Sequence, residues 1–148
     1  MDTEQILANI IAAVTRKFIE LQSQSGHDAG FSDLSLRQIY YLETIQCMQN
    51  PTPTELAQAV QVSKPTVSIT LDKLAKAGFI RKTRSDADKR SYHIHLSQIG
   101  DMFIQTHEGV HRTLAQTILQ GLSPQDARSL TNLLEKSLAV QKKEPENE

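Results

Sequence analysis

Residues 63–78 constrain the fold more than any other stretch, because they predict one helix with both ends marked. Ser63 is a good N-cap, and Pro65 sits in the first turn, where its missing N–H leaves no hydrogen bond unmade. Gly78 suits the left-handed conformation that commonly follows the last helical residue. The stretch therefore predicts a complete helix of defined length.

The two faces of this predicted helix differ in polarity. One face gathers apolar side chains, namely Val67, Leu71, Leu74 and Ala75. The opposite face carries Pro65, Ile69, Asp72, Lys73 and Lys76. We expect the first face to pack on a core and the second to contact another molecule.

A shorter helix is predicted immediately upstream. Thr52 and Glu55 have the spacing of a capping box, and Pro53 suits the first helical position. This helix must end near Val62, because Ser63 already begins the next one. Two helices joined by so short a turn predict a helix-turn-helix.

After Gly78 the sequence pattern changes to that of strands. Residues 79–84 and 91–96 are expected to be strands, and the polar loop 85–90 lies between them. A hairpin with a charged tip, placed directly after a recognition helix, is a wing.

The charge of this region predicts a nucleic-acid partner. Residues 51–96 hold eight basic and four acidic side chains, whereas the whole chain has a net charge of −1. The rest of the chain is therefore acidic, and positive charge gathers on one helix and the hairpin. That distribution is typical of phosphate binding and favours double-stranded DNA as the partner.

The remaining sequence predicts four more helices around this centre. They are expected at residues 3–23, where residues 25–30 break the helix, at 35–49, from Ser97 to Gly121, and from Ser123 to about residue 140. The order α-α-α-α-β-β-α-α gives a mainly α fold with a small β-hairpin wing. We expect a single domain, 1–148, with a winged helix-turn-helix at 35–96, dimerisation helices at 1–32 and 98–141, and a flexible tail at 142–148.

Apolar stripes on the terminal helices predict a homodimer. Ile6, Ile10 and Val14 recur near one end of the chain, and Leu130, Leu134 and Leu138 recur near the other. The compact winged helix is too small to cover all of them, so a second copy of the chain is the simplest cover. A bundle within one chain is the alternative.

The whole-chain composition predicts a cytoplasmic protein. No apolar run is long enough to span a membrane, and residues 3–24 lack the pattern of a signal peptide. Cys47 is the sole cysteine, which suits a reducing compartment. We expect Cys47 to be a buried small side chain, with a peroxide-sensing role as the alternative.

The chain resembles the multiple-antibiotic-resistance regulator (MarR) family of bacterial dimeric winged-helix transcription factors, over about residues 6–140. The matching residues are Leu56-Ala57, Val62-Ser63, Val67-Ser68, Leu71, Leu74, Gly78-Phe79-Ile80, Arg84, Asp86-Ala87-Asp88-Lys89-Arg90 and Leu96-Ser97-Gln98-Ile99-Gly100. The resemblance implies a non-enzymatic regulator, without a cofactor, that is a repressor released by a small effector and binds a pseudo-palindromic operator as a homodimer.

The resemblance also implies how DNA would be bound. In that family the recognition helix enters the major groove, and the wing-tip arginine, here Arg90, inserts in the minor groove while a nearby aspartate orients it. The expected DNA-binding residues are Lys64, Pro65, Thr66, Ser68, Ile69, Lys73, Arg84, Asp86, Lys89 and Arg90. Members often have arginine where Ile69 stands, so we expect an apolar contact to a thymine methyl there.

One further motif leaves several interpretations open. His107 and His111 enclose Glu108 in the H-E-x-x-H pattern of zinc peptidases, but the chain lacks the usual third histidine. The alternatives are a structural pair, a metal site of the kind found in zinc-sensing members of the family, which draw another histidine from the position of Tyr40, or an acyl-ligand site. We expect His107, His111 and Tyr40 to be effector or metal candidates without catalysis.

Overall fold

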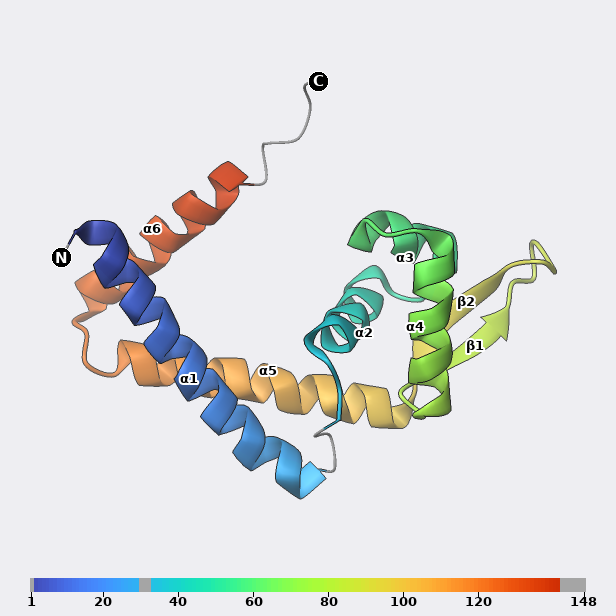
Figure 1. Ribbon diagram of the computed structural model, residues 1–148, viewed down its shortest axis with the longest axis horizontal. Coiled ribbons are helices and arrows are strands. Elements are labelled where there is room, and N and C mark those ends of the chain that lie inside the picture. Colours follow the sequence, from blue (N-terminus) through green and yellow to red (C-terminus); the bar gives the residue numbers. More distant parts are fainter. Residues whose placement is uncertain (1, 30–32, 142–148) are drawn as a thin grey trace. The chain divides into compact units, whose positions relative to one another are not determined.

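The computed structural model describes residues 2–29 and 33–141 of the chain. The elements are, in order, α1 (Thr3–Ala29), α2 (Leu36–Met48), α3 (Pro53–Val60), α4 (Lys64–Lys76), β1 (Ile80–Arg84), β2 (Tyr92–Leu96), α5 (Gln98–Leu119) and α6 (Pro124–Gln141) (Figure 1). This order confirms the predicted mainly α fold with a two-stranded hairpin.

Local caps define the helix-turn-helix. The Thr52 hydroxyl accepts the Glu55 N–H at 3.3 Å, and a Glu55 carboxylate oxygen accepts the Thr52 N–H at 2.8 Å. Gln61 then turns the chain with a left-handed φ of 54°, and Ser63 caps α4. The predicted capping box and short turn are both confirmed.

Gly78 ends α4 in the way that the sequence predicts. Its φ is 82°, its N–H donates to the Ala75 carbonyl at 3.0 Å, and the Phe79 N–H donates to the Leu74 carbonyl at 3.0 Å. These bonds satisfy carbonyl groups that a helix end leaves without partners. The chain therefore turns directly from α4 into β1.

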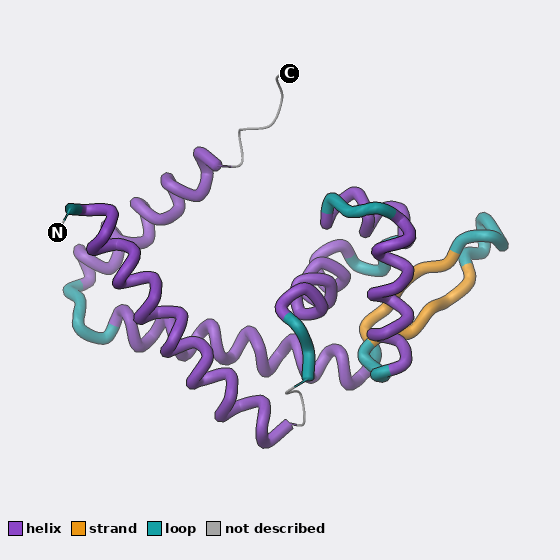
Figure 2. Tube along the Cα trace, viewed as in Figure 1, coloured by secondary structure: helices purple, strands orange, loops and turns teal. Residues whose placement is uncertain are grey.

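The two strands form an antiparallel hairpin (Figure 2), and its buried residues Ile80 and Ile94 belong to the core. Ile80 lies opposite Leu96, and Arg84 lies opposite Tyr92. The core joins α2, α3, α4, the hairpin and the first turns of α5, and its fully buried members include Leu42, Leu56, Val67, Leu71, Leu74 and Ile94. The predicted packing face of α4 is therefore confirmed.

The start of α5 is fixed tightly against the base of the hairpin. The Ser97 hydroxyl donates to the Gly78 carbonyl at 2.5 Å and accepts the Gly100 N–H at 3.1 Å. A Cβ on Gly100 would lie 2.2 Å from the Phe79 carbonyl oxygen, so only glycine fits at this approach. Ser97 caps α5 as predicted.

The first helix is longer than the sequence suggests. Residues 25–30 were expected to break it, but α1 continues to Ala29, so the predicted end near residue 23 is wrong. A glycine inside a helix costs only about 1 kcal/mol relative to alanine, and Gly26 alone is therefore too weak a signal to end one. The expected flexible tail, 142–148, lies outside the described residues.

The chain divides into two compact units, one from Met1 to Val110 and one from His111 to Glu148. The first unit contains the winged helix together with α1, and α5 runs from the first unit into the second. The predicted separation of DNA-binding and dimerisation regions at residues 35–96 and 98–141 remains a prediction.

Candidate nucleic-acid interface

The face of α4 that points away from the core is open to solvent. Its exposed side chains are Lys64, Pro65, Ser68, Ile69, Asp72, Lys73 and Lys76. Thr66 is only partly exposed, and its hydroxyl lies 2.8 Å from the Ser63 hydroxyl within the helix cap. Ile69 is 59% exposed, which confirms that this isoleucine has no place in the core.

The tip of the wing is ordered by one aspartate. The Asp88 carboxylate accepts the Arg90 N–H at 2.9 Å, and the Asp88 carbonyl accepts the Ser91 N–H at 2.9 Å. Arg90 itself is exposed, as are the predicted contacts Arg84, Asp86 and Lys89. Asp88 was absent from the predicted site, although an aspartate that bonds its own backbone two residues on is a recognised turn signal. It fixes the backbone from which Arg90 projects.

A side-chain pair joins the wing to the recognition helix. Lys82 on β1 donates to Asp72 on α4, with Nζ and Oδ1 2.7 Å apart, and the same Nζ lies 5.1 Å from the centre of the Tyr92 ring. The hydrogen bond from Lys82, followed by its charge, lowers the pKa of Asp72. Desolvation alone would lower the pKa of Lys82, but its bonds and charge interactions with Asp72 and Tyr92 outweigh it and raise this pKa.

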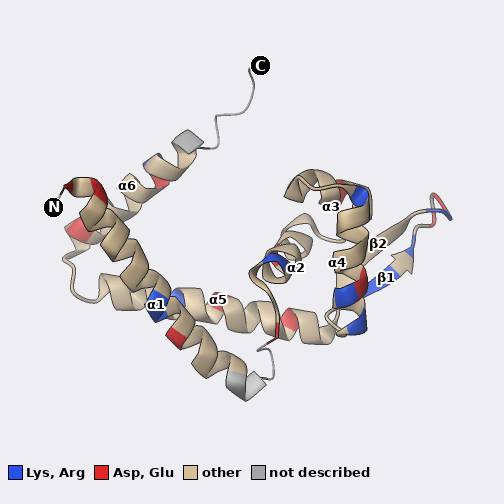
Figure 3. Ribbon diagram, in the orientation of Figure 1, with Lys and Arg blue, Asp and Glu red and all other residues tan. Residues whose placement is uncertain are grey.

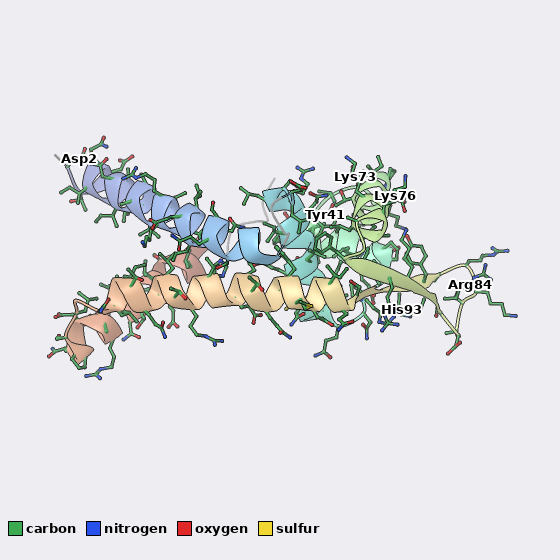
Figure 4. All side chains as sticks on the ribbon, turned by 90° about the horizontal axis from the view of Figure 1, so that it is seen from below. Asp2, Tyr41, Lys73, Lys76, Arg84 and His93 are labelled. Atoms are coloured by element: carbon green, nitrogen blue, oxygen red, sulfur yellow. The ribbon has the colours of Figure 1, made fainter. Side chains whose placement is uncertain are left out.

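Because of this pair, the basic charge of the region is not all equally available. Lys82 is engaged by Asp72, whereas Lys73 and Lys76 on α4 and Arg84 on the hairpin form no ion pair among the residues that the structure describes (Figure 4). Lys and Arg residues occur on both α4 and the hairpin (Figure 3). Two neighbouring elements therefore present cations that a row of phosphates could bind.

The winged helix matches a known family. Residues 34–92 match the profile of the MarR family. Over these residues the chain is similar to proteins of the MarR family. The prediction made from the wing-tip and helix residues is thus confirmed.

Solved structures share the MarR-family fold along nearly the whole chain. The Streptococcus pneumoniae protein FabT, solved in complex with DNA, is 22% identical, with a TM-score of 0.76 over 95% of this chain and 98% of that one. S. aureus MepR bound to ethidium bromide is 21% identical, with a TM-score of 0.73 over 95% and 97%. E. coli MarR is 24% identical, with a TM-score of 0.65 over 93% and 97%. The chain therefore has the fold of these three proteins.

The MarR-family fold places His107 in a buried, aromatic setting. His107 is 6% exposed, stacks on Phe103 with ring centres 5.7 Å apart, and meets the edge of Phe18 at 5.7 Å. Its Nε2 lies 3.1 Å from a Glu43 carboxylate oxygen. Glu43 on α2 is thus the acid beside His107, whereas Glu108, the base of the peptidase motif, is exposed. Neither Phe18 nor Glu43 is near His107 in sequence, so no local signal marks them.

The other candidates on α2 and α5 are exposed. His111 is exposed on α5, one helical turn after His107, and Tyr40 is 50% exposed on α2. Cys47 is exposed as well, so the expectation of a buried cysteine is wrong. The core side of α2 is set by Ile39, Leu42 and Ile45, and a residue two positions after Ile45 points to the opposite side.

None of the helices in the described ranges, 2–29 and 33–141, combines the length and the apolar character needed to cross a membrane.

Proposed function

We propose that this protein regulates transcription by binding a specific operator in double-stranded DNA. The observation that carries the proposal is the exposed face of α4 beside a hairpin with a fixed, basic tip, on a MarR-family winged helix. A convex, cationic helix next to a projecting arm is suited to a duplex, since the major groove admits an α-helix and the phosphates on either side attract cations.

In this proposal the two elements read different grooves. The exposed face of α4 enters the major groove, where Ser68 and Ile69 meet base edges and Lys64 and Lys73 meet phosphates. Ile69 offers only methyl and methylene groups, so its preferred contact is the methyl group of thymine. The wing lies along the backbone, and Arg90 reaches into the minor groove. Phosphate contacts set the position, and the base contacts give specificity.

The protein is proposed to act as a homodimer. On α1, Ile6, Ile10 and Ile11 are 45%, 53% and 56% exposed in the single chain, and on α6 Leu134 and Leu138 are 50% and 60% exposed. Apolar stripes along two helices are poorly suited to water, and burying them in a second copy contributes roughly 25 cal/mol per Å². A two-fold dimer would also present two α4 helices to successive major grooves, about 34 Å apart, and so select an inverted repeat.

A small effector is proposed to release the dimer from DNA, which makes the protein a repressor. MepR was solved with ethidium bromide, which gives precedent for a small ligand on this fold. His107 is the proposed coupling residue, because it joins α5, which leaves the wing, to Glu43 on α2 and to Phe18 on α1. We propose that a ligand or ion bound at one of the candidate residues, His107, His111 or Tyr40, would change the spacing of the two recognition helices. This function places the protein in the cytoplasm.

Gel-shift titration tests the DNA-binding proposal, with an operator selected from a library of random duplexes and with an unrelated duplex for comparison. Arg90→Ala should weaken operator binding by about 1 to 3 kcal/mol, while Lys73→Ala should weaken all sequences alike and lower the salt slope by roughly one. Lys136→Ala is the matched control, because it removes a cation from the side of α6 opposite the leucine stripe. Unchanged operator affinity in Arg90→Ala would show that the tip of the hairpin does not contact operator DNA.

Sedimentation equilibrium tests the dimer separately. Leu134→Asp should shift the protein toward monomer, because it places a charge in the proposed interface, and each buried leucine that is lost costs about 2 to 5 kcal/mol. Leu36→Asp is the control, since Leu36 is 79% exposed at the start of α2 and lies outside the predicted dimerisation regions. A wild-type protein that is monomeric at micromolar concentration would refute the homodimer.

The effector proposal has its own test. The double variant His107→Ala with His111→Ala should retain operator affinity in the absence of effector but lose any response to zinc or to pH between about 5.5 and 8, a range that spans the reference imidazole pKa. A pH and zinc response equal to that of the wild type would reduce the two histidines to packing. Peptide cleavage that the wild type shows and the variant lacks would support the hydrolase interpretation instead.

A further inference from the structure

A polar hollow of about 320 Å³ lies in the first unit, at the base of the wing. Its walls come from the C-terminal end of α2, from β1 and β2, and from the first turn of α5. The polar side chains that line it are Gln46, Gln49, Asn50, Arg81, His95 and Asp101. Since each water molecule takes up about 30 Å³, this space suits a ligand the size of roughly ten water molecules. None of these six residues belongs to the proposed DNA contacts.

The hollow carries one full charge of each sign. Arg81 on β1 and Asp101 on α5 both line it, and neither forms an ion pair with any residue in the ranges 2–29 and 33–141. The C-terminal end of α2 adds partial negative charge, because its last carbonyl groups lie beyond the helical hydrogen bonds and its last turn has no basic residue. The hollow therefore attracts a cationic group and an anionic group at the same time.

The rim of the hollow on the α2 side is fixed before any ligand arrives. The His93 Nδ1–H donates to the Asn50 carbonyl at 2.9 Å, and the Ile94 N–H donates to the Pro51 carbonyl at 2.9 Å. Gln49 and Asn50 both adopt left-handed conformations, with φ of 53° and 65°. Such conformations are uncommon outside glycine, and they persist where the surrounding structure imposes them. A fixed rim lowers the entropy lost on binding a small molecule.

The wall of the hollow that the hairpin forms is also fixed, and Arg81 is the residue in this wall that carries a full positive charge. Arg81 and His95 are partners in the strand register, and His95 Nε2 lies 2.6 Å from the Thr83 hydroxyl oxygen. Desolvation, and then the charges of Arg81 and His93, lower the pKa of His95, so its imidazole is neutral at pH 7. Arg81 is thus the one cation that faces the ligand from this wall.

We infer that this hollow binds a small zwitterion, an α-amino acid whose carboxylate pairs with Arg81 and whose ammonium group faces Asp101 and the carbonyl end of α2. An arginine suits a carboxylate because its fork of N–H donors can bind both oxygens. The amide groups of Gln46 and Gln49 suit a ligand with a polar side chain. L-Glutamine has the size, both charges and an amide, and it is the probe for this site.

Calorimetric titration of the full chain, without DNA, tests the ligand class. L-Glutamine should give saturable binding with one site per chain. N-Acetyl-L-glutamine lacks the ammonium group and L-glutamine amide lacks the carboxylate, so each should bind roughly tenfold to a hundredfold more weakly. Equal binding of either analogue would overturn the zwitterion, and the absence of saturable binding would overturn the site. Saturable binding would also be absent if Arg81 and Asp101 formed an ion pair with each other in solution.

Substitutions place the ligand in this hollow. Arg81→Gln and Asp101→Asn should each weaken L-glutamine binding by about tenfold or more. Arg37→Gln and Glu108→Gln remove the same charges from exposed positions on α2 and α5 outside the hollow, and should bind like the wild type. Circular dichroism checks that all four variants fold. In ¹H–¹⁵N spectra the side-chain amide signals of Gln46, Gln49 and Asn50 should shift on titration. Wild-type affinity in Arg81→Gln and Asp101→Asn, or unshifted amide signals at saturation, would overturn the assignment.

Discussion

The close approach of α5 to the base of the wing makes Gly100→Ala the sharpest stability test of this structure. An added Cβ would lie 2.2 Å from the Phe79 carbonyl oxygen and 3.4 Å from the Leu96 Cβ. The same carbonyl accepts the Ser97 N–H at 2.9 Å, so relieving the overlap strains that hydrogen bond. Overpacking costs about 1 to 3 kcal/mol and a weakened hydrogen bond about 1, which gives a loss of roughly 2 to 4 kcal/mol.

Urea and thermal unfolding at one fixed protein concentration measure this loss, which should lower the Tm by roughly 5 to 15 °C. Gly109→Ala is the matched control on the same helix, because a Cβ there meets nothing within 4 Å. Removing a glycine from a helix interior should stabilise by about 0.5 to 1 kcal/mol, so the two variants should change stability in opposite directions. A Gly100→Ala protein as stable as the wild type would refute the close contact between α5 and the hairpin.

Four further predictions concern the wing, the recognition helix and the exposed cysteine. Asp72→Asn removes a negative charge from the DNA-facing side of α4, but it also breaks the ion pair with Lys82 that holds the wing against α4. Operator affinity in gel shifts should therefore fall roughly two- to fivefold. A rise in affinity would show that the Lys82–Asp72 pair does not position the wing. His95 has a lowered pKa, so its contribution to stability is present above the unfolded-state pKa of about 6.5 and is lost as the pH falls. When the pH is lowered from about 7.5 to 5.5, the Tm of His95→Gln should therefore fall less than the Tm of the wild type. An equal fall would show that His95 does not contribute to the pH dependence of stability. Ile69→Arg should shift the operator selected from random duplexes toward guanine at one position per half-site, whereas an unchanged consensus would count against base contact. Cys47→Ser should change the free energy of unfolding by less than about 0.5 kcal/mol, and a larger loss would mean that Cys47 is not exposed.

The winged helix could be predicted because its signals are local. Ser63, Thr52 with Glu55, and Gly78 act through hydrogen bonds to residues within a few positions, so the sequence alone marks where helices begin and end. The exposure of Ile69 followed from the helical period in the same way. The wing followed from the change of period after Gly78 together with the polar loop.

The contacts that unite distant elements could not be predicted. Lys82 and Asp72 meet because of the angle between β1 and α4, and nothing in the pattern of residues 72–82 specifies that angle. His107 meets Glu43 and Phe18 only through the packing of three helices.

Two errors have different origins. The exposure of Cys47 depends on which side of α2 faces the core, and the length of α1 depends on how little one glycine weakens a long helix. The hollow beneath the wing combines four elements, so it too is a property of the fold rather than of a motif.

Selection from a library of random duplexes with the full-length protein tests the central claim most directly. A homodimer that reads DNA through α4 and the wing should enrich an inverted repeat whose half-sites are centred about one helical turn, roughly 10 base pairs, apart. Arg90→Ala in the same selection should give weaker enrichment of that repeat. Enrichment of a single unrepeated site, or of no sequence at all, would contradict the account.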